Sequence, residues 1–419
     1  MNYTATRKEA VCELVIHLSA GEVEQLFTKA RRNPETSPAK QACLLAQEQY
    51  VQQILDKEHI IPVSPLVITE ELPEDGTPYD LHIRFEALPD IALPERLEEL
   101  NIEVPPPGMD GRSARRMADA LRHSFARRTK VTELRSPVYG EVAVIDMEGS
   151  CESCPAPGFQ AEGRAFLLRK EGSLLPEIQT EIMTILPGQS RTVELSCPED
   201  YPYAGMRGKT LTLTLRLKAI FQEHLPEINA EFAKELGFDS VKALETSIMA
   251  KSMSNELAFI QKEGERRLLQ KLLSQCSIPA PSYTTRRYYD EFMQNARKAL
   301  QRARCSEEQM MEQLKAMEED GHRSAEEQAR AHVFLLALAE REHIRVSEQD
   351  MKTEMESLAR DMKTSPDAVR DQLEKSGMED DVRERILAAK ALTYLYNKAH
   401  KVVVDEKGDI VPPPVIHTA

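Results

Sequence analysis

The sequence predicts a multidomain α+β protein that ends in an all-α body, and three observations support this prediction. Its 419 residues exceed the usual size of a single domain. Residues 210–217 alternate leucines with polar residues, as a strand with one buried face does. After residue 240 this alternation gives way to the apolar spacing of helices, near 3.6 residues. A β-rich unit therefore ends within residues 224–238, and a helical body begins there.

Charge, hydropathy and cysteine content limit the classes of function. The formal net charge of −15 argues against a protein that binds DNA through a broad basic face. No apolar run is long enough to cross a membrane, and the first thirty residues contain no apolar segment typical of a signal peptide. Seven scattered cysteines suit a reducing compartment. We expect a cytoplasmic protein with no membrane partner and no direct DNA binding.

Residues 1–104 are expected to form a small α+β domain. Ser19 can cap a short helix, with Glu22 at the reciprocal position of a capping box. Two prolines in the loop 31–38 end that helix. The other expected elements are strands at 11–18, 66–71 and 79–88 and a helix at 39–58.

The stretch 105–137 is expected to be a linker followed by a helix. Residues 110–130 hold seven basic side chains. Either they form a solvated face that meets an acidic neighbour in the same chain, or they contact nucleic acid, and the acidic net charge favours the first interpretation. Residues 138–223 are expected to be β-rich. The expected elements there are strands near 140–148, 164–169, 190–196 and 210–221 and a short helix near 175–184.

Residues 224–419 are expected to be helical. Ten of the 16 methionines lie after residue 225, and such flexible apolar side chains suit contacts with varied partners. An ordinary helical core is the alternative, and composition alone leaves the two open. Ser347 with Asp350, and Ser365 before Pro366, are further signals for helix starts.

No constellation of an enzyme or a metal site emerges from the spacing. Cys151 and Cys154 form a single CxxC pair, without the second pair that a structural zinc site needs, and a turn between strands is expected around Pro155 and Gly158. His322 and His332 are ten residues apart and lack metal-ligand spacing. Neither a glycine-rich phosphate loop nor a nucleophile elbow is present. We expect no metal and no cofactor.

The junction between the β-rich and helical parts resembles bacterial trigger factor. Pro198 to Tyr201, Gly208-Lys209, Leu225-Pro226-Glu227 and Ala230-Glu231-Phe232 follow that family in order and spacing. The resemblance implies a ribosome-docking domain, an FK-binding-type (FKBP-like) isomerase domain and a helical body with two arms. It further implies an ATP-independent chaperone that binds nascent or unfolded polypeptides, with the ribosome near the exit tunnel as a further partner. Candidate client contacts on the body are Tyr289, Phe292, Met310 and Leu314, for which core packing is the alternative.

Two departures from the family change these expectations. The family docks on the ribosome through a Gly-Phe-Arg-x-Gly-Lys-x-Pro loop, which residues 31–38 lack. Arg31, Arg32 and Lys40 are the basic residues left to contact phosphate or an acidic protein there. A scaffold that binds a non-ribosomal partner is therefore an alternative.

The second departure concerns the isomerase pocket, which encloses proline in an aromatic cup with little water. The resemblance aligns Phe159, Phe166 and Tyr201 with its aromatic members and Asp146 with its acidic residue. The family's other aromatic positions read Met147, Ile178 and Leu213. We expect weak or absent prolyl isomerase activity, with an active isomerase as the alternative.

Overall fold

The computed structural model describes most of the chain. The described residues are 2–8, 10–31, 37–68, 72–106, 111–152, 154–170, 175–201, 206–376 and 378–405. They form two compact units, each built from segments far apart in sequence. Unit 1 contains Met1–Ile102, Gly264–Tyr289 and Arg323–Val402, and unit 2 contains Glu103–Glu263, Asp290–His322 and Val403–Ala419. Three helices, α7, α8 and α10, run from one unit into the other.

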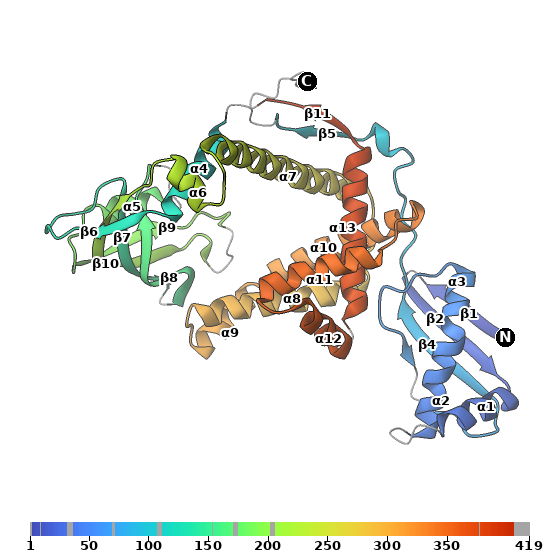
Figure 1. The fold of residues 1–419 in the computed structure, drawn as a ribbon. Helices are drawn as coiled ribbons and strands as arrows, with labels where there is room; N and C mark the ends of the chain where they lie inside the picture. The colour runs from blue at the N-terminus through green and yellow to red at the C-terminus, as the bar shows by residue number, and fades with distance from the viewer. Residues whose placement is uncertain are drawn as a thin grey trace. The chain divides into compact units, whose positions relative to one another are not determined.

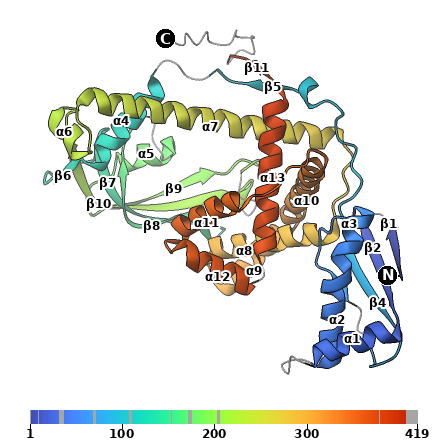
Figure 2. The ribbon, with the colours of Figure 1, turned by 45° about the vertical axis from the view of Figure 1, so that its right-hand side comes forward.

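The N-terminal part of unit 1 is a four-stranded antiparallel sheet with helices on one face (Figures 1 and 2). The strand order is β1-β2-β4-β3. The strands are β1 (Asn2–Lys8), β2 (Val11–Leu18), β3 (Val67–Ile68) and β4 (Tyr79–Glu86). The helices are α1 (Ala20–Ala30), α2 (Pro38–Ala46), η1 (a π-helical turn, Gln47–Val51) and α3 (Gln52–Glu58).

Local chemistry explains how these elements begin. Glu22 accepts hydrogen bonds from the Ser19 amide at 2.8 Å and the Ser19 hydroxyl at 2.6 Å, so the predicted capping box is confirmed. Alternate residues of β2, such as Leu14 and Ile16, are buried against the helices. The sequence did not predict β1, whose polar residues are mostly exposed and which forms the edge of the sheet.

The helical part of unit 1 is assembled around α13 (Glu379–Lys398). The other helices there are the C-terminal part of α7 (Val241–Gln275), the N-terminal part of α8 (Ser282–Arg302), most of α10 (Glu318–Arg341), α11 (Glu348–Met362) and α12 (Pro366–Ser376). A 3₁₀ turn, η2 (Leu97–Glu99), precedes β5 (Asn101–Val104), which pairs with β11 (His400–Val403). Gly264 of α7 packs so closely on Tyr396 of α13 that an added Cβ would lie 2.5 Å from the ring. The two backbones can approach this closely because the position is a glycine.

Unit 2 contains a five-stranded antiparallel sheet in the order β6-β10-β7-β8, with β9 also on β10. The strands are β6 (Arg127–Lys130), β7 (Glu141–Cys151), β8 (Cys154–Leu167), β9 (Ser190–Ser196) and β10 (Thr210–His224). The helices are α4 (Arg112–Ser124), α5 (Pro176–Ile182), α6 (Ala230–Glu235), α9 (Glu307–Ala316) and the parts of α7, α8 and α10 that belong to this unit. The leucines of β10 are buried, as their alternation predicted, and Leu213, Leu215 and Leu217 share a core with α5.

The helix expected at 110–130 is wrong at its C-terminal end. The helix stops at Ser124, and residues 127–130 form β6 on the edge of the sheet. Arg128 is the register partner of Glu223 on β10, and its guanidinium lies 2.8 Å from that buried carboxylate. The ladder and this ion pair together favour a strand over a further helical turn. Of the basic residues in 110–130, Arg128 thus has the acidic neighbour that was expected, namely Glu223.

The turn expected around Pro155 and Gly158 is also wrong. Cys151 and Cys154 are register partners, so the chain turns between them and β8 begins at Cys154. Because β8 is an edge strand with two register shifts, it accommodates a proline and a glycine that a central strand would not. Both cysteines are buried as free thiols.

Candidate functional site

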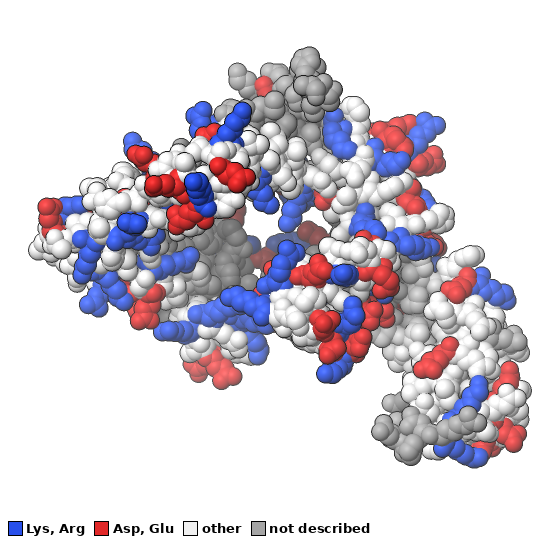
Figure 3. All heavy atoms as spheres, viewed as in Figure 1, with Lys and Arg blue, Asp and Glu red and all other residues white. Residues whose placement is uncertain are grey.

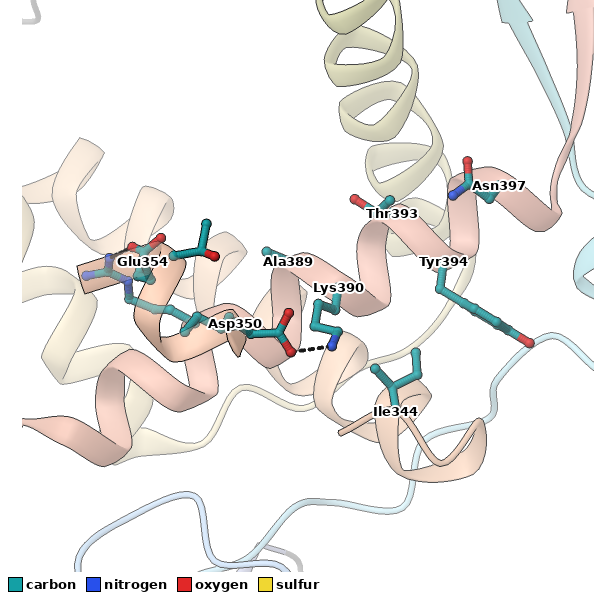
Figure 4. A pocket seen from close by; sticks show the side chains of 11 residues that line it. Ile344, Asp350, Glu354, Ala389, Lys390, Thr393, Tyr394 and Asn397 are labelled. Atoms are coloured by element: carbon teal, nitrogen blue, oxygen red, sulfur yellow. Dashed lines mark hydrogen bonds and ion pairs between the residues drawn. The ribbon is translucent and has the colours of Figure 1, made fainter. Parts of the chain in front are cut away.

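A groove between α11 and α13 is the candidate functional site. It has a cavity volume of about 740 Å³. Ile344 reaches it from the segment after α10 (Figure 4). The remaining lining residues are Asp350, Thr353 and Glu354 of α11 and Arg385, Ile386, Ala389, Lys390, Thr393, Tyr394 and Asn397 of α13.

Helix periodicity explains why α13 presents one continuous wall. Its lining residues from Ile386 to Asn397 follow the three- and four-residue steps that place side chains on one helix face. The opposite face of α13 is buried through Ala388, Ala391 and Leu395. Alanine, threonine and asparagine on the groove side are small, so the wall stays open.

Ile344, Ile386 and Ala389 give the groove its apolar surface. Ile386 is half-buried and packs against a small core of Met351, Met355 and Val382, which holds α11 against α13. Ala389 is exposed on the surface of the helix. Burial of an apolar side chain against these three residues would be favourable, because it removes apolar surface from water.

The charged side chains of the groove are paired with one another. Lys390 Nζ lies 2.6 Å from Asp350 Oδ2 and also donates to the Arg345 carbonyl at 2.9 Å. Arg385 Nη2 lies 3.2 Å from Glu354 Oε1. Lys390, followed by the Ser347 amide and hydroxyl, holds the pKa of Asp350 well below its usual range. The groove therefore presents neutralised charges to a ligand.

Two further hydrogen bonds fix the far end of the wall. The Tyr394 hydroxyl donates to Glu342 at 2.8 Å, and this bond raises the pKa of the phenol. The Thr393 hydroxyl donates to Glu265 of α7 at 2.9 Å. Side chains of α7 and of the segment just after α10 thus hold this end of the α13 wall in place.

The sequence did not predict this groove. The four candidate client contacts lie elsewhere on the helices: Tyr289 and Phe292 are half-buried in α8, and Met310 and Leu314 are buried in a small core with Leu300 and Met317. The core interpretation, which the sequence left open, describes Met310 and Leu314. The groove depends on the space between two helices, and no motif along the chain marks it.

The predicted isomerase residues lie mostly together in the β-rich part of unit 2. Phe159 and Phe166 pack against a core that contains Met147, Ile178 and Leu213. Tyr201 packs against the neighbouring cluster of Cys151, Ala156, Cys197, Met206 and Leu211, which Phe159 also contacts. At the three positions where the family has aromatic residues, the interior is therefore filled by flexible or aliphatic side chains.

Asp146 does not join these residues. Its neighbours Ile145 and Met147 are buried, and its register partner on β10 is the exposed Arg216, so Asp146 lies on the opposite face of the sheet. Its carboxylate accepts bonds from Lys218 and from the Gly163 amide, both at 2.7 Å. Lys218, and then this amide, hold the pKa of Asp146 below its usual range.

At the predicted docking loop, the structure describes two of the three predicted basic residues. Arg31 forms an ion pair with Asp75, and Arg32 lies outside the described residues. Lys40 is exposed in the first turn of α2, whose cap is Ser37. On the face of the molecule in Figure 3, basic and acidic side chains are interspersed over much of the surface that is drawn in colour.

Two other features are absent from the described residues. Among the side chains that the structure describes, no three histidine, cysteine, aspartate or glutamate residues are arranged to hold a metal ion. His332 is instead buried beside Tyr288 and 3.3 Å from Glu384. In the same part of the chain, no helix has both the length and the apolar character required to cross a bilayer.

Comparison with known proteins gives a consistent result. Residues 240–397 match the family model "Bacterial trigger factor protein (TF) C-terminus", and this span includes every residue that lines the groove. The chain is 25% identical over 351 residues to the trigger factor of Nitratidesulfovibrio vulgaris strain Miyazaki F, covering 84% of this chain and 81% of that protein. It is 24% identical over 361 residues to the trigger factor of Lawsonia intracellularis, covering 85% and 83%. A solved structure of the trigger factor chaperone is 18% identical, with coverage of 95% and 99% and a TM-score of 0.39.

Proposed function

We propose that this chain, which is a divergent relative of bacterial trigger factor, holds apolar segments of unfolded polypeptides in the groove between α11 and α13. The similarity to trigger factor supports a chaperone that assists protein folding. The groove is the surface to which we assign the binding of unfolded polypeptides. The observation that supports this assignment is an apolar floor between charges that are already paired.

The chemistry of the groove suits a transient, unspecific client. Burial of apolar surface is non-directional, so a leucine, valine or phenylalanine of the client would gain about equally on the floor of Ile344, Ile386 and Ala389. Because Lys390 and Arg385 are paired with acidic residues, neither sign of charge is strongly selected in the client. No step needs a nucleotide, which agrees with the lack of a phosphate-binding loop in the sequence.

An aggregation assay tests this proposal. Ala389→Glu would place a carboxylate on the floor of the groove, at an exposed helix position where glutamate is a good helix former. Ala120→Glu makes the same change at an exposed position of α4 and is the matched control. We expect the full chain and Ala120→Glu to keep a diluted denatured protein from aggregating, and Ala389→Glu to need severalfold more chaperone. Equal protection by both variants would refute the groove as the client site.

We also propose that prolyl isomerase activity is weak or lost. Met147 and Leu213 are buried in the sheet core, and Asp146 faces away from that core, so the aromatic lining is reduced to Phe159, Phe166 and Tyr201. A smaller aromatic lining should hold a prolyl ring less firmly. The alternative, an active isomerase, predicts that Tyr201→Ala abolishes catalysis of prolyl-peptide isomerisation.

Docking on the ribosome near the exit tunnel is a third part of the proposal. Of the predicted contacts that the structure describes, Lys40 is exposed and has no ion pair with another described residue, whereas Arg31 is paired with Asp75. An interaction with phosphate through so few charges should be weak and should fall with salt. Co-sedimentation with ribosomes at low and high salt tests it. No co-sedimentation even at low salt would favour the alternative of a scaffold for a non-ribosomal partner.

A further inference from the structure

The segment 290–322 contacts residues of the β-rich part of unit 2 that lie more than a hundred residues earlier in the sequence. This helical hairpin comprises the end of α8, α9 and the first residues of α10. It has a small core of its own, formed by Ala296, Leu300, Met310, Leu314 and Met317. This core contains no residue of the sheet.

Two polar contacts join the hairpin to the sheet. Arg207 Nη1, just before β10, lies 2.7 Å from Asp320 Oδ2 of α10. Cys305 Sγ, in the connection between α8 and α9, donates to the Pro155 carbonyl of β8 at 3.6 Å. Cys305 precedes α9 and Asp320 follows it, so the hairpin meets the β-rich part of unit 2 at two separate points.

The same arginine also contacts the predicted isomerase cup. Arg207 Nε donates to the Tyr201 carbonyl at 2.8 Å, while Nη1 binds Asp320. Tyr201 packs with Met206 and Phe159. One planar guanidinium thus connects an aromatic residue of the cup with the acidic start of α10, and this geometry uses the fork of donors that lysine lacks.

The contact is partly removed from water. The Asp320 side chain is only 17% exposed and that of Arg207 32% exposed. Burial, together with the neighbouring Cys154 thiol, raises the pKa of Cys305. Ion pairs with this degree of burial are screened less by solvent than pairs on an open surface.

We propose that the hairpin 290–322 is an intramolecular ligand of the β-rich domain, held beside Tyr201 by Arg207, and that it competes there with prolyl segments of clients. Asp320, in the acidic first turn of α10, is the residue that Arg207 recognises. This surface is separate from the groove between α11 and α13. A failure of the groove assay would therefore leave this proposal intact, and the reverse also holds.

Thiol labelling of the full chain tests the contact. A maleimide reagent would label Cys305, and mass spectrometry of the peptides would compare its rate with that of Cys276, a half-buried thiol of unit 1. Asp320→Asn removes the ion pair. Glu319→Gln removes an exposed carboxylate from the same helical turn and is the matched control, because both changes weaken the interaction with the helix dipole.

We expect Asp320→Asn to raise the labelling rate of Cys305 about fivefold, as loss of about 1 kcal/mol from a partly buried pair implies. Cys276 should be unaffected, and Glu319→Gln should behave as the unaltered chain. Arg207→Gln should give the same rise, and the double variant no more than either single change, because the two side chains act on one contact. An unchanged rate in Asp320→Asn would overturn the proposal.

A binding measurement tests the competition. The probe is a short fluorescent peptide that contains Leu-Pro-Phe, titrated with the full chain and its variants. We expect Asp320→Asn to bind the probe about fivefold more tightly than Glu319→Gln does, since the hairpin no longer occupies the surface. Equal affinities, or no binding by any variant, would show that the hairpin and prolyl segments do not share this surface.

Discussion

Lys390 of α13 and Asp350 of α11 approach to 2.6 Å, and this ion pair joins the two helices that form the groove. Asp350 also closes the capping box of α11 through Ser347. One carboxylate therefore starts a helix and fixes that helix to its neighbour. Protonation of Asp350 should therefore weaken both the cap of α11 and the ion pair with Lys390.

Because its pKa is lowered in the folded chain, Asp350 should make stability depend on pH. The contribution is present above the ordinary aspartate pKa of about 3.9, and it is lost as pH falls below that value towards the folded pKa. Asp350→Asn should therefore lower the midpoint of urea unfolding of the full chain at pH 7 and have less effect near pH 3. Asp361→Asn, at an exposed aspartate of the same helix, is the control. An effect of Asp350→Asn that grows as pH falls would contradict this reasoning.

The packing of α7 on α13 should be sensitive to one methyl group. An added Cβ at Gly264 would lie 2.5 Å from Tyr396, so Gly264→Ala should destabilise the chain by about 1–3 kcal/mol. Gly21 in α1 has nothing within 4 Å of an added Cβ, so Gly21→Ala should stabilise its helix by up to about 1 kcal/mol. Urea denaturation of the two variants would measure these opposite signs. A stabilising Gly264→Ala would show that the helices are farther apart than described.

The isomerase interpretation gives a prediction for Asp146. Because Asp146 is on the face opposite the core of Met147, Ile178 and Leu213, Asp146→Asn should change any prolyl-peptide isomerisation rate by less than about twofold. The unaltered chain should itself show little acceleration over the uncatalysed reaction. A high rate that falls steeply in Asp146→Asn would show that the carboxylate does reach the substrate.

Sequence patterning predicted those elements whose signals are local. The alternating leucines of β10, the capping boxes at Ser19 and Ser347, and the start of α12 at Pro366 depend on nearest neighbours, and all four are present. The edge strand β1 escaped prediction because its polar residues show no alternation, and its ladder with β2 holds it in place. The helix expected at 39–58 is present, but the sequence did not predict its π-helical turn at 47–51.

The candidate site was harder to predict than the fold. Met310 and Leu314 suggested client contacts because they are apolar, yet both are buried in the core of the hairpin. The groove residues Ala389, Thr393 and Asn397 are small or polar, and they form no sequence motif that predicts a binding site. What makes them a site is the space between α11 and α13, which only tertiary packing defines.

Site-specific crosslinking tests the central claim most directly. A photoreactive residue at position 389, on the groove floor, would be compared with one at position 120, on the exposed face of α4, in the presence of a denatured client. We expect crosslinks to the client from position 389, and few from position 120. Equal crosslinking from both positions, or none from position 389, would contradict the assignment of the groove as the client site.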